Sequence, residues 1–275
     1  MRETALYPPP GVAARPSGGL RRGLLRWLVP LGAAMLLLAL WQAAFLLRLY
    51  PPFIIPSPLD VAERFAQVLA DGRLWLHTGA TLSAVLAGLA IGAAAGLGLG
   101  YALARNSLLD SLLSPVIVAL QSTPVVAYAP LLVIWFGSGL TSKVVTSALI
   151  VFFPMLLNTV VGIRGVPQAL YDLLRVNRAT RWQIFTKLEV PSAMPVLLGG
   201  LKIGATLAVI GAVVGEFVSA NAGLGFLINL ARSQYDTPLV LVAVITLAAL
   251  ARLLYGLVAL LERRLLRWQA RARRS

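Results

Sequence analysis

The chain has 275 residues, of which 59% are hydrophobic and 12% charged, and its formal net charge is +14. A soluble domain carries about 25% charged residues, so this composition excludes an ordinary soluble domain and indicates a polytopic membrane protein. The absence of cysteine and the presence of one histidine, His77, exclude a disulfide framework, a thiolate metal site and a histidine-rich metal site.

Six apolar blocks have the length of about 20 residues that crosses a hydrocarbon core. They cover 24–47, 78–104, 111–136, 142–163, 192–218 and 238–261. Arg21 and Arg22 precede the first block, as they would in a twin-arginine signal, but its length and the lack of a cleavage site favour a transmembrane helix. We expect a disordered cytoplasmic tail at 1–23, a transmembrane domain at 24–262 and a basic cytoplasmic tail at 263–275.

The distribution of lysine and arginine predicts the orientation. If the N-terminus is cytoplasmic, the cytoplasmic segments contain 17 of the 24 basic residues, including those of the loop 164–191 and the C-terminal tail. Basic residues beside apolar blocks set membrane orientation, so we favour this role over nucleic-acid binding. Both termini are therefore predicted to be cytoplasmic.

The first outer loop contains the signals of a short helix. Ser57 is a candidate N-cap, Pro58 suits the first helical position, and Gly72 can end the helix. An apolar stripe runs along one side of this segment and consists of Val61, Phe65, Val68 and Leu69. The pattern predicts an amphipathic helix at the outer membrane interface.

The second and third blocks have unusual patterns. Gly88, Gly92, Gly96 and Gly100 recur every four residues in the second block, which predicts a face for close helix packing, within this chain or against a second copy. A nucleotide-binding loop is not supported there, because no strand precedes the glycines and their spacing differs from that of such a loop. Three prolines interrupt the third block, at Pro115, Pro124 and Pro130, and predict a kink or a break.

The longest cytoplasmic loop, 164–191, contains two amphipathic segments. The first follows Pro167 and has Ala169, Leu170, Leu173 and Leu174 on one face. The second, from Thr180 to Val190, has an apolar stripe of Ile184, Phe185 and Leu188, and Pro191 is expected to break it before the fifth span. Two roles are open on physical grounds: interfacial helices resting on lipid headgroups, or a helix that docks in a groove of a soluble partner.

The segment Asp172–Pro195 resembles the cytoplasmic signature loop of ABC importer permeases, the "EAA–G–I–LP" loop of binding-protein-dependent transport systems. The resemblance continues through four further segments: Ile54–Pro58, Trp135–Lys143, Phe152–Pro167 and Gly211–Ile228. The nearest relatives by resemblance are permeases for sulfonates, taurine, nitrate and pyrimidine or riboflavin precursors. Asp172 replaces the usual glutamate, Leu173 and Leu174 replace the alanine pair, and Arg178 replaces the loop glycine, so we expect Asn177 to turn the chain instead.

The resemblance implies an all-α membrane protein with six transmembrane helices and the type I ABC importer permease fold, located in the prokaryotic inner membrane. It implies two ATPase subunits, an extracytoplasmic solute-binding protein and a second permease copy, as a homodimer, as partners. The chain would not be an enzyme: it lacks the phosphate-binding loop of an ATPase, and ATP and Mg²⁺ would bind to the partner. The implied ATPase-coupling residues are Leu170, Asp172, Leu173, Leu174, Arg175, Asn177, Arg178, Ala179, Arg181, Trp182 and Pro191.

Polar residues inside the spans are candidates for the translocation path. They are Gln121, Thr123, Asn158, Glu216 and Arg252, and no metal site or catalytic residue is expected. Glu216 lies near the outer end of the fifth span, where it serves either as a gate or as a local cap. Arg252 lies in the middle of the sixth span, where a charge is costly, so we expect a salt bridge or contact with an anionic solute.

The alternative function is a self-sufficient secondary transporter or channel. Such a protein would favour inverted repeats and carboxylates near the membrane midplane, and the sequence shows neither. Uptake driven by an ion gradient alone would support this alternative, whereas ATP-dependent uptake that requires an added ATPase would exclude it.

Overall fold

The computed structural model describes residues 19–48, 50–51 and 53–267, with the side chains of the first helix described at Val29 and from Leu31 onward. These described residues are helical, with turns between the helices, and form two compact units that divide between Pro58 and Leu59. The expected disordered tail falls largely on 1–18, and much of the expected basic tail falls on 268–275, so both expectations lie largely outside the described residues.

The first unit contains α1, Gly19–Leu46. The described side chains of its second half, Leu31–Leu46, form an apolar stretch shorter than a full span. Beyond the helix the chain turns, and the indole Nε1 of Trp41 donates a hydrogen bond to the carbonyl of Pro56 at 3.0 Å. The predicted first span therefore corresponds to a helix, while its role as a span stays a prediction.

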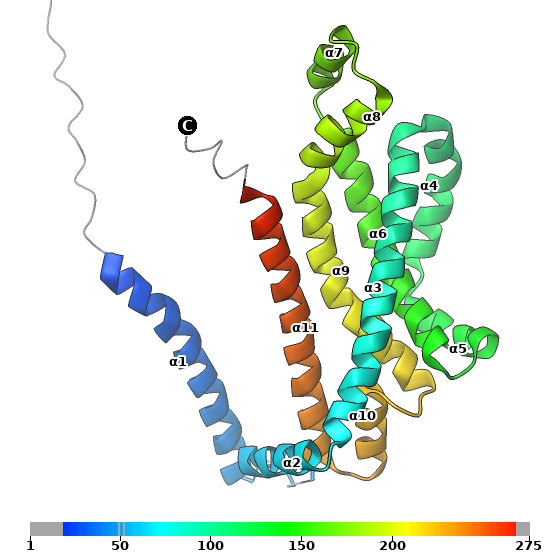
Figure 1. Ribbon diagram of the computed structural model, residues 1–275. Coiled ribbons are helices and arrows are strands. Elements are labelled where there is room, and N and C mark those ends of the chain that lie inside the picture. The colour runs from blue at the N-terminus through cyan, green and yellow to red at the C-terminus, as the bar shows by residue number, and fades with distance from the viewer. Residues whose placement is uncertain (1–18, 49, 52, 268–275) are drawn as a thin grey trace, which may run out of the picture. The chain divides into compact units, whose positions relative to one another are not determined.

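The second unit contains the other helices (Figure 1). They are α2 Pro58–Ala70, α3 Arg73–Arg105, α4 Ser107–Ser122, α5 Val125–Phe136, α6 Leu140–Arg164, α7 Gln168–Val176, α8 Arg181–Ile184, the π-helical turn η1 Phe185–Glu189, α9 Val190–Val218, α10 Leu224–Ser233 and α11 Thr237–Leu265. Within the described residues, four continuous helices are long and apolar enough to cross a membrane: α3, α6, the run Arg181–Val218, and α11. The pair α4 and α5 adds a fifth span if it is counted as one broken span.

The break in the third predicted span is confirmed. Helices α4 and α5 meet at an angle of 94° around Thr123 and Pro124. Pro115 and Pro130 lie inside the two helices, so only the central proline marks the break. The short helix of the outer loop is also confirmed as α2, and Arg64 on it forms an ion pair of 2.6 Å with Asp236 at the start of α11.

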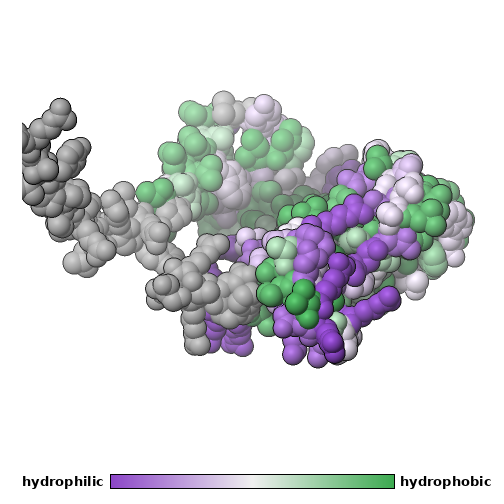
Figure 2. All heavy atoms as spheres, turned by 90° about the horizontal axis from the view of Figure 1, so that it is seen from above, coloured by the Kyte–Doolittle hydropathy of each residue, from purple (hydrophilic) through white to green (hydrophobic). Residues whose placement is uncertain are grey.

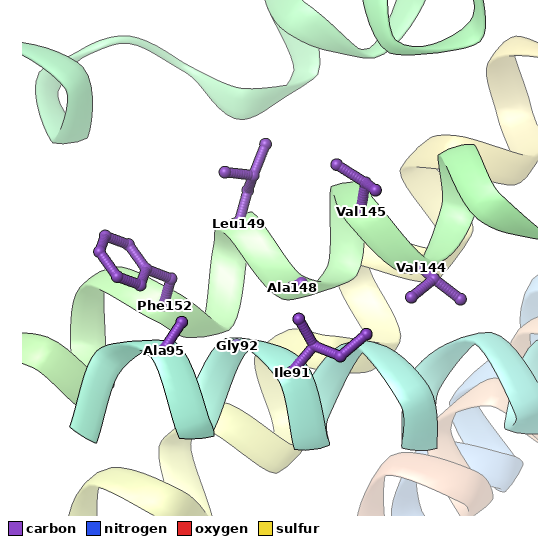
Figure 3. Close-up of a pocket in the computed structure, with 8 residues that line it drawn as sticks. All are labelled: Ile91, Gly92, Ala95, Val144, Val145, Ala148, Leu149 and Phe152. Atoms are coloured by element: carbon purple, nitrogen blue, oxygen red, sulfur yellow. The ribbon is translucent and has the colours of Figure 1, made fainter. Parts of the chain in front are cut away.

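Helices α3, α6 and α9 form the core of the second unit. The four glycines of α3 face α6, and a Cβ atom on any of them would lie within 3 Å of α6 atoms. Figure 3 shows Gly92 opposite Ala148, with Ile91 and Ala95 on either side of it. The glycine face therefore packs inside this chain. A cluster of small and branched apolar side chains continues the contact to α9 and α11 and includes Val85, Val151, Ala208 and Leu250.

Candidate functional site

The loop between α6 and α9 folds as two helical segments that pack on each other. Tyr171 of α7 is buried against Val166 and Leu188, and Leu174 and Ile184 pack around these three. Ile184 and Leu188 therefore hold the second segment against α7. Phe185 instead contacts the bundle, because its ring packs edge-on against Tyr101 of α3 with centroids 5.3 Å apart.

The outer side of α7 is apolar and open. Leu170, Leu173 and Val176 expose 39%, 58% and 83% of their surface. The charged coupling candidates Asp172 and Arg175 are also exposed and pair with each other at 3.5 Å, one helical turn apart. Figure 2, which looks onto the end that carries α7 and α8 in Figure 1, shows hydrophilic residues gathered there around a few hydrophobic ones.

The turn after α7 is made by Arg178. Its φ is +54°, whereas Asn177 has φ −80° and ψ 14°. The amide of Arg178 donates to the carbonyl of Arg175, and the amide of Ala179 donates to the carbonyl of Leu174, both at 2.9 Å, which is the Schellman pattern. The expectation that Asn177 turns the chain is therefore wrong: the arginine occupies the left-handed position that the family glycine would occupy. Asn177 instead bonds back through Nδ2 to the carbonyl of Leu173 at 2.8 Å.

The second segment begins with a capping box. The hydroxyl of Thr180 accepts from the amide of Gln183, and the Gln183 side chain accepts from the amide of Thr180. Arg181 and Trp182 follow at the exposed start of α8, and the Trp182 ring lies 5.6 Å from that of Phe185. The expected break at Pro191 is wrong, because the helix continues from Arg181 through Val218. The π-helical turn η1 directly precedes this region and widens the helix there. In a regular α-helix, the ring and the missing amide of Pro191 would interrupt the hydrogen bonds.

Glu189, at the end of η1, is 1% exposed and joins three elements. Its carboxylate accepts hydrogen bonds from the hydroxyl of Tyr101 on α3 at 2.9 Å and from the hydroxyl of Tyr171 on α7 at 3.1 Å. Arg105 on α3 forms an ion pair with it at 3.2 Å and lies over the Tyr171 ring. We call these four residues the Glu189 cluster. Burial, with a further contribution from the Glu189 charge, raises the pKa of Tyr171 to about 12, so this phenol stays protonated and remains a donor at physiological pH.

Two of the path candidates share a pocket. Gln121 on α4 and Asn158 on α6 line a cavity of about 400 Å³ together with apolar side chains that include Phe153 and Val125. The Nδ2 of Asn158 donates to the carbonyl of Pro154 at 2.8 Å. Thr123 lies at the α4–α5 break, and its hydroxyl donates to the carbonyl of Ala119.

Glu216 lies apart from this pocket, at the far end of α9. It is 1% exposed, and its carboxylate accepts from the hydroxyl of Thr81 at 2.8 Å and from the amide of Gly225 at 2.7 Å. The Thr81 hydroxyl in turn accepts from the amide of Leu224. Two of the unpaired amides at the start of α10 are thus satisfied, and the carboxylate lies at the positive end of the helix dipole. This geometry is that of a local cap.

Arg252 lies near the middle of α11 and is exposed. Its guanidinium lies over the ring of Tyr255 at 5.9 Å. It also lines a cavity of about 590 Å³ with Lys202 and Glu262, which form an interhelical ion pair of 2.8 Å. The path candidates therefore fall into three separate places: the amide pocket, the α10 cap and this basic cavity.

The sequence prediction missed Glu189, Tyr101, Arg105 and Thr81. A signal was present for three of them. Tyr101 and Arg105 are four residues apart and share a face of α3. Glu189 is a carboxylate directly before an apolar span, a position where burial requires a partner.

The chain matches the protein family "Binding-protein-dependent transport system inner membrane component" over residues 88–267. The chain belongs to this family. It is 53% identical to the riboflavin transport system permease protein RibX of Chloroflexus aurantiacus, over 86% of this chain and 88% of that protein. It is 34% identical to the formylaminopyrimidine transport permease protein ThiX of Halalkalibacterium halodurans, over 86% and 93%.

Among solved structures, an inward-facing form of the methionine ABC transporter MetNI is similar in fold, with a TM-score of 0.63 and 21% identity, over 70% of this chain and 97% of the matched chain. The family and the fold agree with the resemblance of the signature loop. The protein is thus a multi-pass inner-membrane permease subunit of an ABC importer, and ATP hydrolysis belongs to another subunit.

Proposed function

We propose that α7 docks on an ATP-hydrolysing subunit and that ATP binding there moves the membrane helices of this permease. The observation that carries the proposal is the exposed apolar surface of α7, with Leu173 at 58% and Val176 at 83%, on a helix whose other side is buried. An exposed apolar helix face surrounded by charges is a typical partner surface. Most of the other coupling candidates lie on α7, in the turn after it and at the start of α8, whereas Pro191 lies in α9.

The topology that we propose has six spans with both termini in the cytoplasm. The four continuous apolar helices and the broken pair would provide five spans by their length and composition, and α1 would be the sixth. The excess of basic residues in the segments then assigned to the cytoplasm supports this orientation. Because the chain has no cysteine, single cysteines can be introduced at exposed Gln168 and at exposed Asp71 and treated with a membrane-impermeant reagent added to one side of the membrane at a time. Labelling of Gln168→Cys from outside would refute the orientation.

The assembly that we propose contains two copies of this permease, two ATPase subunits that bind ATP and Mg²⁺, and an extracytoplasmic solute-binding protein. Membership in a family of binding-protein-dependent systems supports this composition. Each permease copy would offer one α7 to one ATPase subunit. The mass of the purified complex, measured by native mass spectrometry, tests the two-to-two ratio.

The solute that we propose is a neutral heteroaromatic compound of the riboflavin type. Two observations support it: the 53% identity to a riboflavin permease, and the chemistry of the pocket at Gln121 and Asn158. Carboxamides both donate and accept hydrogen bonds, as the ring edges of such compounds do, and Phe153 offers an aromatic surface. Thr123, at the α4–α5 break, would influence the shape of the translocation path. Glu216 would stabilise the outer end of this path by capping α10.

A second candidate solute is an organic anion such as a sulfonate. The observation that favours it is the basic cavity at Arg252 and Lys202. Uptake by the complete transporter in proteoliposomes, with riboflavin and taurine offered in parallel, separates the two. We expect ATP-dependent riboflavin uptake that requires the ATPase subunit. Taurine uptake would overturn the solute assignment, and uptake driven by an ion gradient without the ATPase would overturn the function.

A further inference from the structure

Glu189 is a buried carboxylate in a part of the chain that is rich in exposed basic residues. Arg175, Arg178, Arg181 and Lys187 around it are exposed, whereas Glu189 is 1% exposed. A buried charge is tolerated where it is paired and hydrogen-bonded. Glu189 meets this condition through Tyr101, Arg105 and Tyr171, which come from two different helices.

The hydrogen bonds of the Glu189 cluster use both oxygens of a carboxylate. One carboxylate oxygen receives the Tyr101 hydroxyl at 2.9 Å, and the other receives the Tyr171 hydroxyl at 3.1 Å and faces Arg105 at 3.2 Å. A glutamine at this position would present one acceptor oxygen and one NH₂ donor, so one hydroxyl would lose its acceptor and Arg105 would lose its counter-charge. Glu189→Gln therefore changes the bonding and keeps the shape.

The cluster is the polar connection between α7 and the membrane helices. The apolar contacts of α7 are with Val166, Leu188 and Ile184, on the two ends of its own loop. Such contacts are non-directional, so they favour burial of this side of α7 more than one particular orientation of it. The Tyr171–Glu189 bond, extended to Tyr101 and Arg105, is directional and ends on α3.

The π-helical turn reinforces this arrangement. Phe185 and Glu189, its first and last residues, both contact Tyr101 of α3. Single π-helical turns are rare and occur often at functional sites. The turn thus gives the start of α9 a two-point contact with α3, one point apolar and one charged.

From this geometry we infer that Glu189 is a positioning residue that transmits the displacement of α7 to α3 and α9. The inference rests on the proposed docking of α7 on the ATPase subunit. If the Glu189 cluster is broken, α7 still docks and ATP is still hydrolysed, but its movement is no longer passed to the membrane helices.

The test compares ATP hydrolysis with solute uptake in proteoliposomes that contain the complete transporter. For Glu189→Gln we expect normal co-purification of the ATPase subunit and a fall of about 5- to 150-fold in solute taken up per ATP hydrolysed, the range of coupling between distant sites. Tyr171→Phe removes a single hydroxyl and should lower the ratio in the same direction by less. The matched control is Asp110→Asn, which removes a charge paired with Arg164 at the same end of the bundle and has no contact with Tyr171; its ratio should equal the parent's.

A second measurement separates positioning from loss of stability. Cysteines at exposed Gln168 on α7 and exposed Ser107 on α4 carry spin labels in the otherwise cysteine-free permease. We expect one narrow distribution of the distance between the two labels in the parent and a broadened one in Glu189→Gln and in Tyr171→Phe. Both variants should keep the helical content and the oligomeric size of the parent. This measurement needs no ATPase.

The outcomes distinguish the two proposals. One outcome is that the parent transporter couples uptake to ATP, while Glu189→Gln and Tyr171→Phe both keep the parent's uptake ratio within about twofold and its narrow distance distribution. In that case the role of Glu189 is refuted and the docking of α7 stands. If the ATPase subunit does not associate with the parent permease, the docking proposal is refuted, and the coupling role of Glu189 with it.

Discussion

Replacing Gly96 by alanine tests the close packing of α3 on α6. A Cβ atom at this position would lie 2.7 Å from the Cβ of Met155 and 2.7 Å from the carbonyl oxygen of Phe152. Ordinary contact begins at 3.4 Å, so α6 would have to retreat by about 0.7 Å in a tightly packed core. Because one of these neighbours is backbone, a change of rotamer cannot relieve the contact.

Gly98 provides the matched control, two residues along the same helix. A Cβ at Gly98 meets no atom within 4 Å, so Gly98→Ala adds the helix propensity of alanine without a clash. That propensity term, up to about 1 kcal/mol, is common to both variants and cancels in the difference. Overpacking costs about 1–3 kcal/mol, and Gly96→Ala should therefore be less stable than Gly98→Ala by about this amount.

The assay is the thermal midpoint of the purified permease in detergent, followed by size-exclusion chromatography of heated samples. A difference of about 1–3 kcal/mol corresponds to about 2–12 °C for a chain of this size, with Gly96→Ala lower. If Gly96→Ala melts at or above the temperature of Gly98→Ala, the α3–α6 contact does not exist as described. The close packing of the glycine face of α3 on α6 would then be refuted.

Three further predictions concern α7, the turn after it and the start of α10. Arg178→Gly should raise the stability of the loop by up to about 1 kcal/mol, because glycine removes the backbone strain of an arginine in the left-handed conformation. Hydrogen exchange of the amides at the end of α7 should therefore slow, and faster exchange would contradict the prediction. Leu173→Asp should abolish co-purification of the ATPase subunit while the permease stays folded. Leu174→Asp should in addition unfold the loop, because Leu174 packs on the apolar core of the loop. Limited proteolysis distinguishes the two variants. Gly223→Ala should expose the start of α10 to proteolysis, because Gly223 has φ +128° and its Cβ would collide with the Glu216 carboxylate, and an unchanged digestion pattern would count against the cap.

Much of the fold could be predicted because its signals are local. Three prolines in one apolar block predicted the break between α4 and α5, and one of them, Pro124, lies at it. Ser57 and Pro58 predicted the start of α2. A glycine every fourth residue predicted a packing face on α3, although the partner, α6, could be seen only in the structure.

The candidate site was less predictable because its contacts are between residues distant in the sequence. Tyr101 and Glu189 are 88 residues apart, and no periodicity links such a pair. Pro191 was expected to end a helix, but the π-helical turn before it allows the helix to continue. At Asn177 and Arg178, local preference favoured the asparagine for the left-handed position, and the hydrogen bonds of the Schellman turn placed the arginine there instead.

Two buried carboxylates, Glu189 and Glu216, connect both ends of α9 to α3. Glu189 precedes α9 and Glu216 lies near its end, about 40 Å away at 1.5 Å per residue, and each binds a residue of α3. The glycines of α3, together with Gly211 of α9, hold the two helices against α6 between these points. Helices fixed at both ends and packed along their length move together, because slight sliding would break buried polar bonds at both ends at once. If α7 is displaced as proposed, α3, α6 and α9 should therefore turn as one body, and we expect the 94° break between α4 and α5, beside the amide pocket, to absorb the movement.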